Sequence, residues 1–338
     1  MDLLFIFLPA ILALGIITSI EDIKTGKIRN KWLLLALAYF MIGSIIVLIY
    51  SMPSRSYLIF TAINAAASLV LGMILWHFGI WSAGDAKLFF VFCLLIPLST
   101  YEIVSSQYFP GFDLLANIFA AAVIFFIFAI MIRSDLKQKK EILSKTFSIN
   151  SIVITALNIF AISWIVSFML GFTGLKEIFL IMCISFAANF AVQSFLKRYT
   201  FLIIAVAILR LFIDQQIYSW QFITVFSVTV LAWAITTEFL NQSSSVLFSK
   251  ELDPRQLKKG MVLAEMFSYK KISIDAEPEG LSDRQIASIR KLYKIDRNHK
   301  RKIRIRDTTP FAIFIFIGVL ITIILGMNLI QYIKLVIK

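Results

Sequence analysis

The sequence predicts an all-α, polytopic membrane protein, a transmembrane bundle of about nine to ten helices with a small cytoplasmic domain before the last span. Hydrophobic residues make up 59% of the chain and charged residues only 16%, against roughly 25% charged residues in soluble domains. The mean hydropathy is +0.86. A soluble core this apolar would leave too little polar surface to cover it, so a lipid environment is indicated.

Ten apolar runs are the candidate membrane spans, because a spanning helix needs ~20 mainly apolar residues. Their approximate bounds are 3–20, 32–50, 57–80, 86–98, 114–132, 152–169, 178–195, 201–213, 222–240 and 310–330. The runs divide the chain into an N-terminal transmembrane region (1–105), additional transmembrane helices (106–240), a basic cytoplasmic domain (241–309) and a C-terminal transmembrane helix (310–338).

The distribution of charge predicts how these spans are oriented. The chain carries 33 Lys and Arg against 20 Asp and Glu. Most basic residues lie in alternate loops, including 24–31 and 133–145, and in the segment 241–309. Positively charged loops stay in the cytoplasm, so both termini are expected outside a multi-pass cell-membrane protein. Attraction to anionic lipids explains the basic excess without nucleic-acid binding.

The hydrophilic segment 241–309 is expected to form its own small domain. Leu281, Ile286, Ile289 and Leu292 share one face of a short amphipathic helix. Ser282, with Gln285 three residues later, gives that helix a capping-box start.

Two carboxylates at the ends of apolar runs are the residues most able to carry chemistry. Asp22 directly follows the first run, and Asp85 precedes the fourth. An intervening helical hairpin can bring them side by side at the cytoplasmic membrane edge. Two carboxylates in one site cannot easily both ionise, so one can act as base and the other as acid toward an attacking water. The alternative is that each is an interfacial charge or a helix cap, and Asp85 would suit a helix N-terminus.

The residues around both aspartates resemble motifs of the type IV prepilin peptidases, the GxGD class of membrane aspartic peptidases, and of its archaeal prepilin and preflagellin branch in particular. Asp22 opens the stretch Asp-Ile-Lys-Thr-Gly-Lys-Ile-Arg-Asn, which is similar to the family's first motif ending in Ile-Pro-Asn. Ile28 and Asn30 match that ending, whereas Arg29 stands where Pro is usual.

The second motif of this family is Gly-x-Gly-Asp, usually followed by a small residue and Lys. Here Gly84, Asp85 and Lys87 match it, and Ser82 replaces the first Gly. Gly84 has no side chain, so backbone or substrate can approach Asp85 closely.

A third resemblance covers the hydrophilic segment. The stretches 257–261 (Leu-Lys-Lys-Gly-Met), 280–286 (Gly-Leu-Ser-Asp-Arg-Gln-Ile) and 310–311 (Pro-Phe) are similar to elements of some archaeal members. The likeness is greatest over residues 1–105 and 251–320, and residues 106–250 match only as apolar spans.

The resemblance implies an aspartic endopeptidase with Asp22 and Asp85 as catalytic pair and water as nucleophile, so neither metal nor cofactor is expected. The implied substrates are prepilin-like or preflagellin-like precursors of type IV pili or archaella, whose short basic leader is removed at the cytoplasmic membrane edge. Bacterial members also carry a cysteine-rich methylation loop. Only Cys93 and Cys183 occur here, both within apolar runs, so proteolysis without methylation is expected.

Four acidic residues are candidates for holding a basic leader by charge complementarity, namely Glu21, Asp275, Glu277 and Glu279. The alternative for the last three is a solvated loop.

Two other classes of function remain open at this point. A secondary transporter would use Asp22, Asp85 and Arg210 on a proton or solute path, although the repeats and broken helices frequent in transporters are absent from the sequence. A non-catalytic assembly protein would use its basic domain to bind lipid or a partner.

Overall fold

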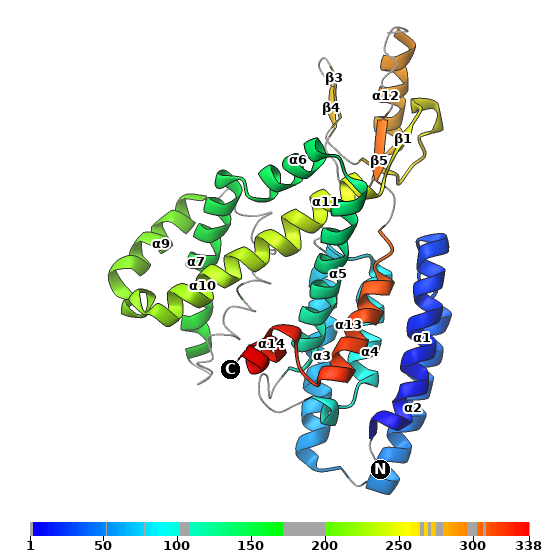
Figure 1. The fold of residues 1–338 in the computed structure, drawn as a ribbon, viewed down its shortest axis with the longest axis vertical. Helices are drawn as coiled ribbons and strands as arrows, with labels where there is room; N and C mark the ends of the chain where they lie inside the picture. The colour runs from blue at the N-terminus through cyan, green and yellow to red at the C-terminus, as the bar shows by residue number, and fades with distance from the viewer. Residues whose placement is uncertain are drawn as a thin grey trace.

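The computed structural model describes residues 3–51, 53–77, 79–101, 109–171, 185, 200–263, 267–269, 272–274, 280–295, 303–306 and 309–337. The described chain is dominated by apolar helices, which confirms the predicted fold class (Figure 1).

Six helices pack into one bundle, and they are α1 (Leu3–Thr25), α2 (Asn30–Ser51), α3 (Arg55–His77), α4 (Ala83–Leu95), α5 (Gly111–Arg133) and α13 (Ala312–Leu325). The last of these six, α13, lies against α5, α1 and α4, although it is distant from them in sequence (Figure 1). Ile11, Leu88, Phe92, Ile118 and Ile315 are fully buried in the core they share. The short 3-10 helix η1 (Leu98–Thr100) follows α4.

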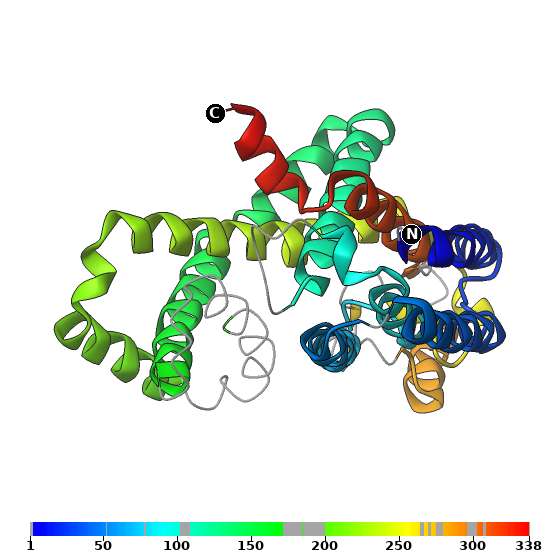
Figure 2. The same ribbon diagram turned by 90° about the horizontal axis from the view of Figure 1, so that it is seen from below.

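A second group of helices lies beside this bundle, as the view from below shows (Figure 2). It contains α7 (Ile149–Gly171), α9 (Thr200–Ile213), the 3-10 helix η2 (Gln215–Tyr218) and α10 (Trp220–Trp233). The short helix α6 (Leu136–Thr146) leads into it from α5. The π-helical turn η3 (Ala234–Phe239) and α11 (Leu240–Leu247) lead back to the bundle, where α11 contacts α5 and α6.

Five described helical segments are long and apolar enough to cross a membrane, and they are Leu3–Thr25, Asn30–Tyr50, Arg55–His77, Gly111–Arg133 and Leu136–Met169. In the last segment the apolar part is α7, because α6 is rich in Lys. Phe201–Ile213, Trp220–Trp233 and Ala312–Leu325 are apolar but shorter. The predicted run 178–195 lies outside the described residues, except for Ser185. The protein is therefore a multi-spanning membrane protein.

The last predicted run, 310–330, is not one continuous helix. Helix α13 ends at Gly326, whose φ of 65° is a left-handed conformation that favours glycine, and α14 (Leu329–Ile337) follows. Asn328 fixes this turn to α5 by donating a 2.6 Å hydrogen bond to Asp113. Asn117 of α5 accepts the backbone N–H of Leu329 at 2.8 Å. The apolar run hid this break because both sides of it are hydrophobic.

The hydrophilic segment contains short strands that periodicity did not predict. β5 (Ile303–Arg306) lies between β1 (Ser249–Leu252) and β2 (Val262–Leu263), antiparallel to both. β3 (Phe267–Tyr269) pairs with β4 (Ile272–Ile274). The described part of the segment also contains the 3-10 helix η4 (Pro254–Gln256) and helix α12 (Asp283–Ile295). The expected capping box is confirmed, since the backbone N–H of Ser282 donates to Gln285 Oε1 at 2.8 Å.

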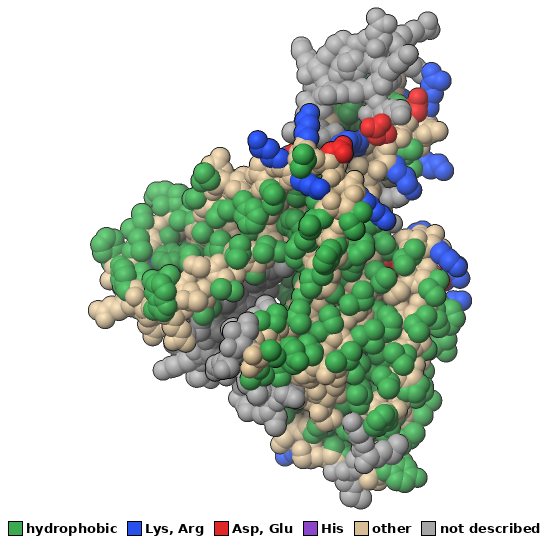
Figure 3. All heavy atoms as spheres, viewed as in Figure 1, with side chains coloured by type: hydrophobic (Ala, Val, Ile, Leu, Met, Phe, Trp, Pro, Cys, Tyr) green, Lys and Arg blue, Asp and Glu red, His purple; other side chains and the backbone are tan. Residues whose placement is uncertain are grey.

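Charged side chains gather at one end of the molecule. On the face seen in Figure 3, hydrophobic side chains cover the long helices, and blue and red side chains cluster around the strands and the adjacent helix ends. The same end of the bundle holds the C-terminus of α1 (Figure 1). Both motifs described above lie at this end, where apolar helices give way to charged loops.

Candidate active site

Asp22 occupies the last turn of α1 and is buried, with 6% of its surface exposed. Its carboxylate Oδ2 accepts the backbone N–H of Ala312, the first residue of α13, at 3.0 Å. The first N–H groups of a helix have no partner within the helix and carry a partial positive charge. Asp22, at the end of α1, therefore accepts a hydrogen bond from the start of α13.

Asp85 occupies the first turn of α4 and is also buried, with 5% exposed. Its Oδ2 accepts the Ser82 hydroxyl at 2.7 Å and the Ser82 backbone N–H at 2.9 Å. In return, the Asp85 backbone N–H donates to Ser82 Oγ at 3.2 Å. This reciprocal capping box starts α4 and fixes the direction of the Asp85 side chain.

The fold brings the two aspartates into one buried region. Helices α1 and α4 are in contact, and α13 touches both. Asp22 ends α1 and Asp85 begins α4, so both buried carboxylates lie on helices that touch each other. Two carboxylates in one site can serve as base and acid toward a water molecule.

The supporting residues of the two motifs also meet. A Cβ on Gly84 would come within 3.2 Å of the Ile28 side chain, so the absence of a side chain lets α4 approach the loop after α1. Lys87 Nζ donates to Asn30 Oδ1 at 3.3 Å. These two contacts connect the start of α4 to the stretch that follows Asp22.

The two departures from the family pattern both make hydrogen bonds beside an aspartate. Arg29 stands at the usual Pro position, and its backbone N–H donates to Glu21 Oε2 at 3.2 Å, which a Pro could not do. Its Nε lies 3.0 Å from Glu21 Oε1. Ser82 stands at a usual Gly position and supplies a hydroxyl to Asp85 that Gly would lack.

Among the predicted leader-binding residues, only Glu21 lies in the described part of the chain. Its side chain is 13% exposed and pairs with that of Arg29, which is 61% exposed. A basic leader that used Glu21 would have to share it with Arg29 or displace Arg29. Asp275, Glu277 and Glu279 lie outside the described residues.

Aromatic side chains beside the aspartates were not predicted as part of the site. Phe311 precedes Ala312, and its ring lies 5.9 Å from that of Trp81. The rings of Phe89 and Phe119 also lie against Trp81, at 5.2 and 6.0 Å. This cluster holds the start of α13 next to the start of α4. The Pro-Phe element before the last run was the one sequence signal that could have indicated it.

Arg210, named for the transporter alternative, lies away from the aspartates in the second group of helices. It is 3% exposed and pairs with Asp214 at 3.0 Å, as the i,i+4 spacing allows. It also donates to Ser163 Oγ at 2.7 Å and to the Phe160 carbonyl. Its guanidinium also lies over the rings of Phe160 and Phe222. This charge is fully engaged in packing α7, α9 and α10 together.

The fold and this site define a multi-spanning α-helical membrane protein with two buried carboxylates on touching helices at the charged end of its bundle. The chain is similar to a prepilin peptidase, EppA of Methanothermobacter thermautotrophicus, with 25% identity over 91% of each chain. This similarity confirms the resemblance to archaeal prepilin peptidases. No family model matches the chain, and no solved structure matches it.

Proposed function

We propose that this protein is a membrane aspartic endopeptidase that removes short basic leader peptides from prepilin-like or preflagellin-like precursors. The observation that carries the proposal is that Asp22 and Asp85 are both buried and lie on α1 and α4, which touch each other and α13. The similarity to a prepilin peptidase along nine tenths of the chain supports the peptidase class.

In the proposed reaction, one carboxylate accepts a proton from water while the other donates a proton to the scissile carbonyl oxygen. The water oxygen bonds to the carbonyl carbon, and collapse of the tetrahedral intermediate breaks the C–N bond as the amine takes up a proton. The hydrogen bonds from Ser82 to Asp85 and from Ala312 to Asp22 keep both side chains directed. Ordered carboxylates lower the entropic cost of reaching the reactive geometry.

We place the reaction at the cytoplasmic membrane edge, since basic loops stay in the cytoplasm and Asp22 is followed by such a loop. A precursor helix entering from the lipid would present its junction with the basic leader at this level. Glu21 and the acidic stretch 275–279 are our candidates for attracting the leader.

The proposal is tested with the full-length protein reconstituted in vesicles and a precursor carrying a basic leader before an apolar helix. Asp22→Asn and Asp85→Asn each keep the side-chain size but remove the exchangeable proton, so each should abolish cleavage. The double variant should be no worse than either single one, because the pair acts as a unit. Asp283→Asn is the matched control, since that side chain is 76% exposed in the hydrophilic segment. Substantial cleavage by either single variant at normal expression would overturn the proposal.

The transporter alternative receives less support. A shared path would require Arg210 to act with the two aspartates, whereas Arg210 is bound to Asp214, Ser163 and Phe160. Precursor cleavage with unchanged ion flux across the vesicle membrane would separate the two functions.

A further inference from the structure

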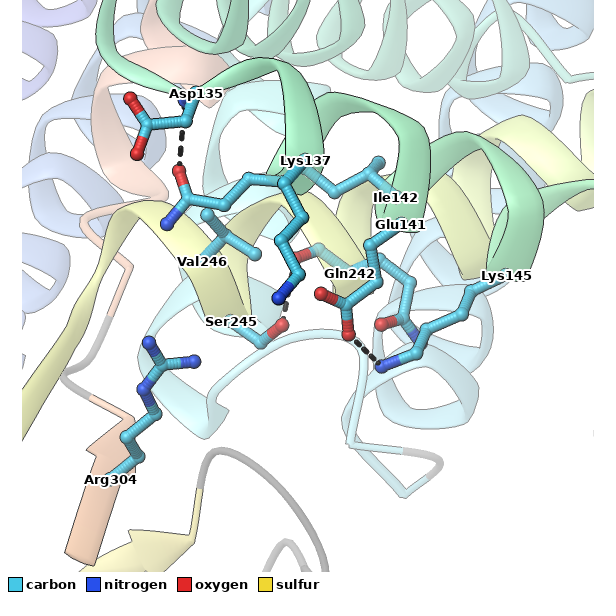
Figure 4. A pocket seen from close by; sticks show the side chains of 10 residues that line it. Asp135, Lys137, Glu141, Ile142, Lys145, Gln242, Ser245, Val246 and Arg304 are labelled. Carbon is cyan, nitrogen blue, oxygen red and sulfur yellow. Dashed lines mark hydrogen bonds and ion pairs between the residues drawn. The ribbon is translucent and has the colours of Figure 1, made fainter. Parts of the chain in front are cut away.

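A polar cavity of about 360 Å³ lies between α6, α11 and β5, at the charged end of the molecule (Figure 4). Its volume is in the usual range of small-ligand pockets. Side chains from all three elements line it, with Lys137 and Lys145 from α6, Ser245 from α11 and Arg304 from β5.

The charges in this cavity favour an anion. Three cationic side chains line it, against the carboxylates of Asp135 and Glu141. Glu141 is already bound to Lys145 at 2.7 Å. Asp135 is held at the start of α6, where its side chain closes a capping box with Gln138. The carboxylate of Glu141 is thus already paired with a cation, which leaves Lys137 and Arg304 against Asp135.

The two remaining cations are held less tightly. Lys137 extends into the space between Ser245 and Glu141 (Figure 4). Arg304 lies 3.9 Å from Glu251, the long limit for an ion pair, and both side chains are about half exposed. Both cationic groups can therefore turn toward an anionic ligand. The Ser245 hydroxyl, by contrast, donates its hydrogen to the Gln242 carbonyl at 2.7 Å.

The position of α6 indicates where such an anion would come from. Leu136, Leu143 and Phe147 share one side of this helix, and they are 83%, 53% and 42% exposed. Lys137, Glu141 and Lys145, spaced four residues apart, line the cavity from a neighbouring side.

Helix α6 directly follows α5, a candidate membrane span that ends at Arg133. A short helix with one apolar side and one basic side typically lies in the membrane interface, its apolar side among acyl chains and its cations among head groups.

We propose that this cavity binds the phosphate of an anionic phospholipid head group, with Lys137 and Arg304 as its principal ligands. The lipid's acyl chains would extend along the exposed apolar side of α6. A bound head group would connect α6, α11 and β5, and hence the helical bundle and the hydrophilic segment.

The test measures lipid binding by the delipidated full-length protein, using native mass spectrometry with added phosphatidylglycerol or phosphatidylcholine. The wild type should retain one phosphatidylglycerol with at least tenfold preference. Lys137→Gln with Arg304→Gln should remove that preference. The matched control is Lys140→Gln with Lys291→Gln, which removes the same charge from residues outside the cavity and should bind as the wild type does.

A competition with glycerol phosphate separates a lipid from a free phosphate, because both offer the same anionic group. The lipid should remain bound at millimolar glycerol phosphate. Displacement at that concentration would identify a soluble phosphate ligand and overturn the lipid assignment. Equal phosphatidylglycerol binding by the two double variants, or no preference in the wild type, would overturn the site itself.

Discussion

Asp22 accepts a hydrogen bond from the backbone of Ala312, although 290 positions separate them in the chain. The end of the first helix and the start of α13 are thereby joined at the carboxylate that we propose to be catalytic. The start of α13 follows the hydrophilic segment in the chain and contacts this carboxylate directly. The position of α13 is consequently a determinant of the site as well as of the core.

The first prediction concerns Phe311, whose ring holds the start of α13 against Trp81 and Phe119. Phe311→Ala should lower kcat by about tenfold or more, because small displacements of a catalytic group are costly. It should also destabilise the fold by about 3 kcal/mol, as large-to-small core changes do.

The measurements for this variant are steady-state cleavage and thermal unfolding. Phe128→Ala is the matched control, since Phe128 is 60% exposed on α5 and should change neither quantity. A Phe311→Ala protein that unfolds earlier but cleaves at the wild-type rate below its unfolding temperature would separate α13 from catalysis.

The second prediction concerns Ser82, which positions Asp85. Ser82→Ala removes the 2.7 Å hydroxyl bond to the carboxylate. We expect kcat to fall roughly tenfold with KM unchanged, since a hydrogen bond to a charged group contributes about 1.5–3 kcal/mol. The loss of the helix cap should cost about 1 kcal/mol of stability.

Ser82→Thr keeps the hydroxyl and should restore kcat to within about twofold, on the same hydrogen-bond argument. This rescue distinguishes positioning from a general loss of stability. If Ser82→Ala cleaved as fast as the wild type, the hydroxyl would have a purely structural role as a helix cap.

The sequence predicts those features of the fold that depend on residues close together in the chain. The long apolar runs predicted α1, α2, α3, α5 and α7, because a membrane span is a continuous local pattern. The α12 capping box was equally local. The strands β1, β2 and β5 are two to four residues long and partly charged, so they lack a measurable alternation.

The candidate active site shows the same difference between local patterns and contacts between distant residues. Asp22, Asp85 and their motif partners could be named from local patterns, although their meeting depended on assuming a helical hairpin. The bond from Ala312 to Asp22 could not be predicted, because a backbone N–H has no residue signature and the two positions are distant in sequence. The roles of Arg29 and Ser82 were hidden because both depart from the family pattern and act through geometry.

The third prediction concerns membrane topology, which follows from the positions of the basic loops. Single cysteines at Ser54 and Ala287, both exposed, are introduced after Cys93 and Cys183 are replaced. An impermeant thiol reagent applied to intact cells should label the cysteine at position 54 and not the one at 287. Permeabilised cells should show labelling at both positions. The reverse pattern in intact cells would place the aspartates on the outer side.

The last prediction separates two roles for Glu21, which is bound to Arg29 by a side-chain contact of 3.0 Å and a backbone contact of 3.2 Å. In the first role, Glu21 attracts the basic leader and Arg29 competes with that leader. Glu21→Gln should then raise KM for basic leaders several-fold at low salt, and this difference should shrink as salt screens the charges. Arg29→Gln frees Glu21, so it should lower KM.

In the second role, the pair only shapes the loop after α1. Both single variants should then lower kcat, and the double variant should be no worse than either, as for partners in one contact. Leaders with zero, two and four lysines, assayed across a salt series with all three variants, decide between the roles. A KM for Arg29→Gln that falls as lysines are added to the leader would assign Glu21 to substrate binding, whereas equal losses of kcat for every leader would assign it to the loop.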